Sequence, residues 1–365
     1  MKEKMYRVGI VGATGMVGQR FVRLMENHPW FRVTCLMASE RSAGKSYRDA
    51  VGEKWAFDCP IPAYAADMIV MDAADIDAVA PLCDFVFCAV SMDKKATREL
   101  EESYARHEIP VVSNNSACRM LPDVPMLIPE VNADHTRVIA AQRKRLGTQH
   151  GFIAVKPNCS IQSYVPALTP LMPYGIEQIS VCTYQAISGA GKTFKTWPEM
   201  EDNVIPFISG EEEKSEQEPL KVWGKVSQEG GRIVPAAAPV ISAQCLRVPV
   251  QDGHMAAVSV KFTRKPEKED ILKLWQNGGT IAQELGLPSA PRPFLRYFEE
   301  DNRPQTRLDR DFEGGMGVTI GRLREDPLFD YKFVCLSHNT LRGAAGGAVL
   351  SAELLCAQGY ITPKE

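Results

Sequence analysis

A cysteine at position 159 occupies a chain position from which covalent chemistry could start. The apolar run 152–155 predicts a short buried strand, and Pro157 ends it because proline cannot donate to a sheet ladder. Residues 160–171 predict a helix, so Cys159 lies at a strand-to-helix turn. Free backbone N–H groups and the positive end of a helix dipole lower a thiol pKa and favour the nucleophilic thiolate. Most cysteines are inert and buried, so this assignment depends on the rest of the chain.

A glycine-rich turn follows the first predicted strand. Residues 6–11 are apolar, the segment 12–18 carries three glycines, and an amphipathic helix comes next. Glycines let the backbone approach a pyrophosphate, which binds at the helix N-terminus. The spacing G-x-x-G-x-x-G differs from the commoner G-x-G-x-x-G, and a plain tight turn is the alternative to a dinucleotide site. The predicted cofactor contacts in this turn are Gly12, Thr14, Gly15, Met16 and Val17.

The next predicted strand, 32–37, ends in a polar segment where an adenosine ribose would bind. An acidic residue at this place favours NAD, whereas arginine and hydroxyl groups favour the 2′-phosphate of NADP. Glu40 argues for NAD, and a solvated loop is the structural alternative. Four residues argue for NADP and outnumber Glu40, so we expect NADP. They are Ser39, Arg41, Ser42 and Lys45.

Strands and helices alternate through the first half of the chain. Further buried strands are predicted over 85–90 and 109–113, each after a helix-like stretch. The alternation indicates an α/β fold with a parallel, doubly wound sheet. Because ligands bind at the carboxyl ends of such strands, we expect Ser91 to face the cofactor and Arg119 to contact an anion. A surface arginine is the alternative for Arg119.

The pattern changes in the second half. Strands are predicted over 178–186, 242–250, 255–262 and 316–323, with few helices between them. This indicates a mixed sheet in an α+β second domain, which often supplies an oligomer interface. The third strand is expected to pair back on the second. The segment 348–355 predicts a helix that returns to the first domain.

The turn 187–193 imitates a phosphate-binding loop. Such a loop needs G-x-x-x-x-G-K-[ST], and Ala186 stands where its first glycine would be. We therefore reject ATP binding and interpret the segment as a glycine-rich turn near a nicotinamide.

Composition is that of an ordinary globular protein. The 365 residues are 45% hydrophobic and carry a net charge of −3, which gives no electrostatic basis for binding nucleic acid or an anionic membrane. No apolar run of about 18 residues is present, and the charged residues 1–7 lead directly into a strand. Ten cysteines without a Cys-x-x-Cys pair argue against a metal site and a disulfide framework. We expect a cytoplasmic protein.

Several motifs, in order along the chain, resemble those of aspartate-semialdehyde dehydrogenases. They are the segments 12–18, 157–160, 184–191, 247–254 and 338–343. The resemblance extends over nearly the whole chain, and residues 210–214 are closer to the archaeal and fungal branch than to the enterobacterial one. It implies a Rossmann-like dinucleotide-binding domain of residues 1–157 and 339–365. It also implies a catalytic and dimerisation domain of residues 158–338, in a homodimer or homotetramer.

The resemblance also implies an activity. The family reversibly converts L-4-aspartyl phosphate and NADPH into aspartate semialdehyde, NADP and phosphate through a cysteine thioester, in the biosynthesis of lysine, threonine and methionine. Carried over by motif, Cys159 is the nucleophile, His254 is the acid–base and Gln185 holds the thioester. The implied substrate contacts are Arg247 for the α-carboxylate, Glu218 for the ammonium, and Arg119 and Lys221 for the phosphate. The implied contacts at the nicotinamide end are Ser188, Gly189 and Asn339.

This sequence departs from the family pattern at two places. The usual Glu-Thr-Leu-Lys reads Glu-Pro-Leu-Lys at 218–221, and proline is tolerated only in a first helical turn or a kink. An exposed ion pair is the structural alternative there, and Glu211 and Lys214 repeat the spacing two turns earlier. Lys156 stands where a neutral residue is expected, and its cation favours a thiolate at Cys159.

Three other functions stay open. Reductases of N-acetylglutamyl phosphate usually carry glycine before the cysteine, and Asn158 argues against them. Malonyl-CoA reductase resembles the same branch and is harder to exclude. A non-catalytic sensor of the nicotinamide redox state would bind the cofactor without turnover.

Overall fold

The first half of the chain folds into a six-stranded sheet in which all neighbouring strands are parallel. The computed structural model describes residues 5–364. The doubly wound fold predicted from the sequence is confirmed, because the chain leaves the middle of the sheet in both directions. In spatial order the strands are β3 (Val70–Asp72), β2 (Phe31–Ala38), β1 (Tyr6–Val11), β4 (Phe85–Cys88), β5 (Val111–Ser113) and β6 (Ile153–Val155).

Both faces of this sheet are covered, as its unbroken apolar strands require. Phe87 points into a hydrophobic core with Phe21, while its neighbour Val86 points into a second core with Tyr104. The helices of this half are α1 (Met16–Leu24), α2 (Tyr47–Val51), α3 (Ala63–Ala66), α4 (Ile76–Val79), α5 (Lys94–Arg106), α6 (Pro129–Asn132) and α7 (Ile139–Leu146).

Two of the three glycines in the turn after β1 are required by the turn itself. Gly12 has a φ of +84°, and a Cβ there would lie 2.4 Å from the carbonyl oxygen of Ala89. A Cβ at Gly18 would lie 2.1 Å from the carbonyl oxygen of Gly12, so α1 could not begin so close to the strand. At Gly15 the nearest atom is 3.5 Å away, which leaves room beside the helix N-terminus.

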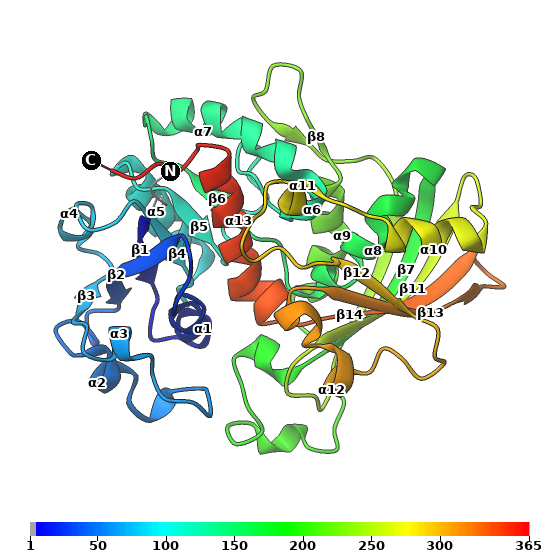
Figure 1. The fold of residues 1–365 in the computed structure, drawn as a ribbon, viewed down its shortest axis with the longest axis horizontal. Coiled ribbons are helices and arrows are strands. Elements are labelled where there is room, and N and C mark those ends of the chain that lie inside the picture. Colours follow the sequence, from blue (N-terminus) through cyan, green and yellow to red (C-terminus); the bar gives the residue numbers. More distant parts are fainter. Residues whose placement is uncertain (1–4, 365) are drawn as a thin grey trace.

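The second half forms a six-stranded mixed sheet beside the first (Figure 1). One face of β11 is buried against Trp275 of α10, and the other face is partly exposed. In spatial order the strands are β10 (Val240–Arg247), β7 (Ile176–Gln185), β11 (His254–Phe262), β14 (Tyr331–Ser337), β13 (Val318–Glu325) and β12 (Leu295–Phe298). The remaining elements are α8 (Val165–Leu168), α9 (Glu211–Val222), α10 (Lys268–Gln276), α11 (Ile281–Glu284), α12 (Thr306–Asp309) and the short pair β8 (Lys225–Val226) and β9 (Ile233–Val234).

The predicted pairing of residues 255–262 with the preceding strand is wrong. β10 pairs in parallel with β7, and β11 pairs with the other side of β7. The intervening segment crosses the end of β7, where Val248 donates to the carbonyl of Gln185 and Ile187 donates to that of Val250. These bonds carry the chain over β7 instead of folding it back as a hairpin.

The helix predicted over 160–171 is also interrupted. The structure has a 3₁₀ turn at Ser160–Gln162, the four-residue α8, and another 3₁₀ turn at Thr169–Tyr174. Pro166 and Pro170 lack the N–H groups that a continuous helix would need. Cys159 therefore precedes a single tight turn and not a regular helix.

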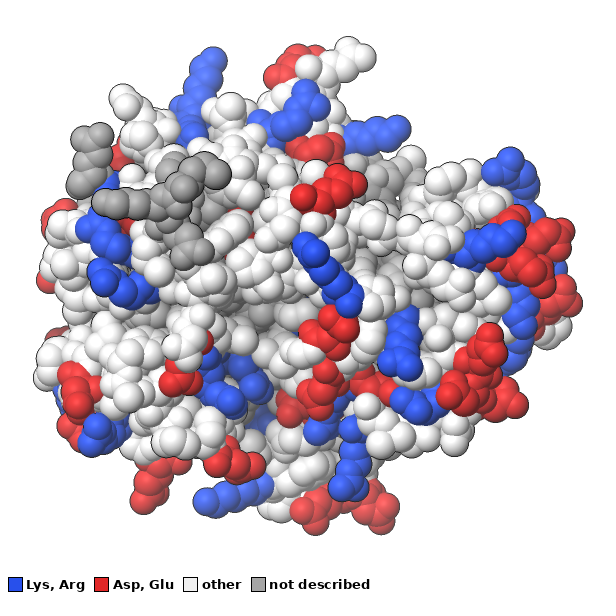
Figure 2. Space-filling model, in the orientation of Figure 1, with Lys and Arg blue, Asp and Glu red and all other residues white. Residues whose placement is uncertain are grey.

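The last helix, α13 (Gly346–Ala357), returns to the first sheet as predicted. It packs against β5 and α6, and its side chains belong to the core that contains Phe87. It follows a single turn of π-helix at Leu341–Ala345. Among residues 5–364, no helix combines the length and the apolar character needed to cross a bilayer. Figure 2 shows charges of both signs interspersed over one face of the molecule.

Candidate active site

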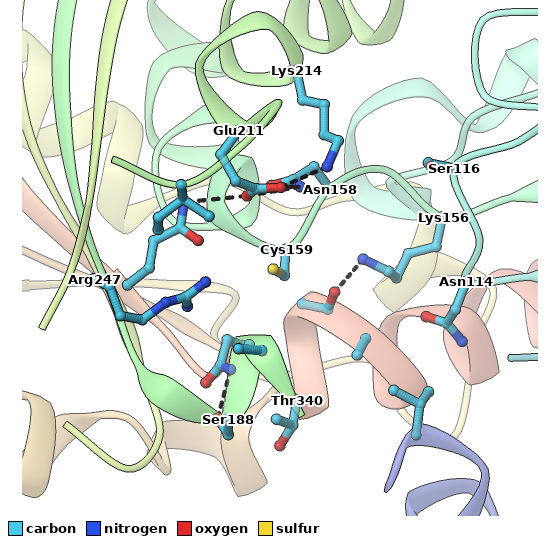
Figure 3. A pocket seen from close by; sticks show the side chains of 18 of the residues that line it. Asn114, Ser116, Lys156, Asn158, Cys159, Ser188, Glu211, Lys214, Arg247 and Thr340 are labelled. Atoms are coloured by element: carbon cyan, nitrogen blue, oxygen red, sulfur yellow. Dashed lines mark hydrogen bonds and ion pairs between the residues drawn. The ribbon is translucent and has the colours of Figure 1, made fainter. Parts of the chain in front are cut away.

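The candidate site is a cavity of about 500 Å³ that residues from both halves of the chain line. Figure 3 shows the sulfur of Cys159 near its centre, with Arg247 and Lys156 on opposite sides. Eight of the residues predicted from the sequence line it, and a ninth, His254, contacts Cys159. Those that line it are Val17, Arg119, Cys159, Gln185, Ser188, Gly189, Arg247 and Asn339.

The predicted nucleophile Cys159 and the predicted acid–base His254 are in contact. The sulfur of Cys159 lies 3.4 Å from Nε2 of His254, although 95 residues separate them in sequence. Cys159 follows β6, the last strand of the first sheet, and His254 is the first residue of β11. The pair therefore joins the two halves of the molecule at their boundary.

The environment of Cys159 differs from the prediction. Burial raises the pKa of its thiol, and the carboxylate of Glu211 adds to this. Lys156, Arg119 and Arg247 act in the opposite sense but do not overcome the burial. The residues directly after the cysteine form a 3₁₀ turn and not the long helix on which the expected dipole effect depended. On balance, burial disfavours the thiolate form of Cys159.

The position of His254 depends on Asn339. The side-chain oxygen of Asn339 accepts from the amide of Gly253 at 2.8 Å, and its amide group donates to the hydroxyl of Ser188 at 2.8 Å. Gly253 has a φ of +102°, which a residue with a side chain rarely adopts. Asn339 thus ties the start of β11 to the turn 187–191.

Gly189 makes room for the charged side of the cavity. A Cβ on this residue would lie 2.9 Å from a guanidinium nitrogen of Arg247 and 3.1 Å from Nε2 of His254. Arg247 is buried and donates to the carbonyl of Ala186 at 2.7 Å, which fixes its guanidinium beside Cys159. Part of its planar fork of donors remains available to a carboxylate or phosphate.

Glu211 is the carboxylate of the cavity. It accepts hydrogen bonds from Asn158, Gln185 and Lys214, the last at 2.7 Å. Burial raises the pKa of Glu211, but Lys214 and the two amides outweigh this, so its pKa lies below the ordinary value. The side chain is therefore an anion, held in place from three sides.

Glu218 and Lys221 do not reach the cavity, contrary to their predicted substrate roles. Glu218 accepts from Arg119 at 3.0 Å and from the amide of Asn158, and Lys221 donates to the carbonyls of Arg119, Leu121 and Val124. Glu218 lies two helical turns after Glu211, and Lys221 two turns after Lys214, which is about 10 Å further along α9 in each case. Burial lowers the pKa of Lys221 to about 8. This pair holds the loop that carries Arg119.

Lys156 is a buried part of the cavity wall. Its ammonium group donates to the carbonyls of Pro157 and Gly343, and burial lowers its pKa to about 7. It joins the cysteine turn to the turn before α13. The electrostatic effect on Cys159 that the sequence suggested is in the expected direction.

A second cavity, of about 360 Å³, lies beside the glycine turn. It contains three basic side chains and two serine hydroxyls within a short stretch of chain. Its lining residues are Thr14, Ser39, Arg41, Ser42, Lys45, Ala50 and Lys54. Gly12, Gly15, Met16 and Ser91 line neither cavity, although the first three form the turn between the two.

Several lining residues were missed from the sequence. Asn158 holds Glu211 and also accepts from the amide of Ser160 at 2.8 Å, an Asx-type turn that the Asn-Cys-Ser order could have indicated. Asn114 and Ser116 follow β5, in the loop where only Arg119 was singled out. Thr340 and Gly343 belong to the motif 338–343, in which only Asn339 was given a role, because the π-helical turn that begins at Leu341 is not visible in the sequence.

Comparison with known proteins bears on this geometry. Residues 7–139 match the model of the semialdehyde dehydrogenase NAD binding domain, and residues 168–342 match that of the semialdehyde dehydrogenase dimerisation domain. The aspartate-semialdehyde dehydrogenase of Archaeoglobus fulgidus is 44% identical over 358 residues, which cover 98% of this chain and 99% of that protein. The chain belongs to the aspartate-semialdehyde dehydrogenase family. It is therefore an oxidoreductase, as the resemblance implied.

Relatives from fungi support the same membership. The aspartate-semialdehyde dehydrogenase of Saccharomyces cerevisiae is 39% identical over 364 residues, 97% of this chain and 98% of that protein. The crystal structure of aspartate semialdehyde dehydrogenase with NADP from Candida albicans matches with a TM-score of 0.88 and 38% identity, covering 98% of this chain and 100% of that one. The aspartate-semialdehyde dehydrogenase fold thus extends over both sheets and α13. The predicted similarity to archaeal and fungal members agrees with these matches.

Proposed function

We propose that this protein is an NADP-dependent aspartate-semialdehyde dehydrogenase that works through a thioester on Cys159. The observation that carries the proposal is the contact of Cys159 with His254 inside a cavity that also holds Arg247 and Glu211. A buried nucleophile, a proton-bearing partner, a cation and an anion are what a small amino-acid acyl phosphate requires. Membership of the family supports the same reaction.

The two charged walls of the cavity suit the two ends of the substrate. Arg247 would bind the α-carboxylate, because a guanidinium can donate two parallel hydrogen bonds to it. Glu211 would bind the ammonium group in place of Glu218, since its carboxylate is ionised and lines the cavity. For the phosphate we propose Arg119 and Lys214, with Lys214 replacing the inaccessible Lys221.

The chemistry follows from this arrangement. The thiol proton of Cys159 would pass to His254 as the sulfur attacks the acyl carbon. An S–C bond forms, and the bond from carbon to the phosphate oxygen breaks as phosphate leaves. Gln185, in the cavity wall, would orient the thioester. His254 would act as the general acid–base for the proton of the Cys159 sulfur. NADPH supplies the hydride that reduces the thioester carbon when it is bound. Cleavage of the S–C bond then releases the aldehyde.

The residues of the first sheet fit this cofactor. Because Gly12 and Gly18 have no Cβ atoms, the turn after β1 and the start of α1 can pack close together. A pyrophosphate site at a helix N-terminus needs this close packing. Arg41, Lys45 and Lys54 around the second cavity suit a 2′-phosphate. Ser188, Gly189 and Asn339 would hold the nicotinamide end, near Cys159.

We also propose a cytoplasmic homodimer or homotetramer. The ten cysteines are unpaired, which suits a reducing compartment. The outer face of the mixed sheet carries apolar side chains, with Tyr184 36% and Val240 70% exposed, and this face would be covered by a second copy. The match of residues 168–342 to a dimerisation domain supports this.

The proposal is tested by assaying aspartate semialdehyde, phosphate and NADP beside malonyl-CoA with NADPH. We expect turnover with the first set only, loss of turnover in Cys159→Ala with cofactor binding retained, and normal turnover in Cys182→Ala, which changes another partly exposed cysteine. Turnover of malonyl-CoA alone would show a different reductase. Cofactor binding without turnover of either substrate would favour the nicotinamide sensor.

A further inference from the structure

The ammonium group of Lys156 has one hydrogen-bond donor to spare. It donates to the carbonyls of Pro157 and Gly343, and an ammonium group carries three N–H donors. The side chain lines the cavity, and Figure 3 shows its nitrogen directed towards Cys159. The remaining N–H is therefore available to an acceptor inside the cavity.

The charge of this ammonium group is buried without a counter-ion. Lys156 is 2% exposed and takes part in no ion pair among residues 5–364. Burial lowers its pKa to about 7, and the positive charge of Arg119 adds to this. Glu218 acts in the opposite sense, but its carboxylate is already paired with Arg119 at 3.0 Å. Two neighbouring buried cations are unfavourable unless an anion binds between them.

The two other lysines considered as substrate contacts are already engaged. Lys221 donates to three carbonyls, which uses all of its N–H groups. Lys214 is paired with the carboxylate of Glu211 at 2.7 Å. Of these three lysines, Lys156 is the one that combines a spare donor with an uncompensated charge.

Arg119 and Asn114 bring further donors to this part of the wall. The guanidinium of Arg119 uses three of its five N–H groups, in bonds to two backbone carbonyls and one carboxylate. Both polar side-chain atoms of Asn114 are buried and have no hydrogen-bond partner among the described residues. Figure 3 shows Asn114 and Lys156 on one side of Cys159 and Arg247 on the other. Two cations and an unused amide thus lie away from the wall proposed for the α-carboxylate.

We propose that Lys156 is a ligand of the substrate phosphate, which binds on the side of Cys159 opposite Arg247. The inference rests on the proposed function, and adds a residue to Arg119 and Lys214. A phosphate dianion between Lys156 and Arg119 would neutralise both charges and accept the spare N–H groups. When the acyl phosphate reacts, the electron pair of the breaking carbon–oxygen bond stays with the phosphate oxygen, and a cation stabilises the charge that develops there.

The contact is particular to this sequence. Lys156 stands where the family pattern leads us to expect a neutral residue. Lys221, the lysine that the family pattern assigns to the phosphate, has no donor left for it. Lys156 would therefore supply from the cysteine turn the charge that α9 does not bring into the cavity.

Three substitutions at this position test the charge. Lys156→Met keeps the apolar stem and removes the ammonium group, whereas Lys156→Arg keeps a cation. Lys156→Gln is a second neutral variant, which retains an N–H donor for the Gly343 carbonyl and serves if the methionine variant does not fold. Lys144→Met is the control, since Lys144 is an exposed lysine on α7.

The measurement is the dissociation constant of inorganic phosphate by calorimetry, together with KM for phosphate and for aspartate semialdehyde. The neutral variants should raise both phosphate constants about 10- to 150-fold, because a hydrogen bond to a charged group is lost. Their KM for aspartate semialdehyde should change little. Lys156→Arg should recover most of the loss, and Lys144→Met should bind phosphate as the wild type does.

Three results would overturn the inference. One is a folded neutral variant with the phosphate affinity of the wild type, and another is a wild type that does not bind phosphate. The third is an equal loss for phosphate and aspartate semialdehyde, which would show that Lys156 only holds the cysteine turn. Phosphate binding needs no turnover, so binding that depends on Lys156 in a protein inactive on aspartate semialdehyde would contradict the proposed function and not this contact.

Discussion

Tyr164 donates its hydroxyl hydrogen to the backbone carbonyl of Ser215, at 2.9 Å. In a regular helix this carbonyl would accept from residue 219, and Pro219 has no N–H to give. Proline is ordinarily tolerated only in the first turn of a helix or at a kink, yet α9 continues through Pro219 to Val222. The buried tyrosine replaces the missing donor, so Lys221 still reaches its three carbonyls.

Tyr164→Phe should lower the free energy of unfolding by about 1–3 kcal/mol, because it leaves the Ser215 carbonyl buried without a donor. Chemical denaturation measures this. In a Pro219→Ala background, where the helix supplies its own N–H, the same substitution should cost less. An equal cost in both backgrounds would mean that the hydroxyl acts elsewhere.

Glu211→Gln should raise KM for aspartate semialdehyde roughly 10- to 150-fold, with a smaller change in stability. Its carboxylate faces the cavity, and a bond to a charged group contributes about 1.5–3 kcal/mol. Steady-state kinetics and denaturation of the same preparation separate the two effects.

Lys221→Met changes a residue of the pair Glu218 and Lys221, which does not reach the cavity. In contrast to Glu211→Gln, it should reduce stability strongly and change KM little. It should lower the free energy of unfolding by at least about 1–3 kcal/mol, since buried carbonyls lose a shared donor. Its KM should change little in the fraction that stays folded. A large rise in KM at unchanged stability would restore Lys221 as a substrate residue.

Arg41→Ala should raise KM for NADP far more than KM for NAD, because Arg41 lines the cavity proposed for the 2′-phosphate. Cofactor titrations monitored by fluorescence, together with kinetics, would measure both constants. Arg48→Ala is the control, since Arg48 is exposed on α2 and paired with Asp67. If NADP and NAD were affected equally, Arg41 would not distinguish the cofactors.

His254 should make the wild type less stable in acid than His254→Gln. Burial lowers the folded-state pKa of His254 to about 3, and the unfolded value is about 6.5. Between these values the unfolded chain binds more protons, so the free energy of unfolding falls as pH falls below 6.5. At pH 5 the loss should be about 2 kcal/mol relative to the variant. Denaturation curves from pH 8 to pH 5 that stay parallel would contradict the low pKa.

The parts of the fold with strong local patterns were predictable. The strand at Tyr6–Val11 was predicted at its observed bounds, because a buried parallel strand is a continuous apolar run. The pairing of β11 could not be predicted, because hydrophobic periodicity indicates where a strand lies but not which strand it pairs with. The interruption of the helix after Cys159 could have been predicted from Pro166, because proline disrupts a helix interior. The apolar pattern over 160–171 favoured a continuous helix instead.

The candidate site was predictable where a motif is short and continuous. Cys159, His254 and Arg247 meet as expected. The choice between Glu218 and Glu211 could not be made, because both have a lysine three residues later and only the direction in which α9 enters the cavity distinguishes them. The hydrogen bond that the backbone amide of Ala186 donates to Nδ1 of His254 also follows from tertiary packing alone.

The return of α13 to the first sheet has a consequence for the order of folding during synthesis. The core around β1 and β4 is completed by Val349 and Leu350, which the ribosome adds only after every strand of the mixed sheet. Domains usually fold as units while the chain emerges, N-terminal first. In this chain the first sheet lacks the apolar side chains of α13 until the mixed sheet has been synthesised, so its core can be completed only after the second half of the chain.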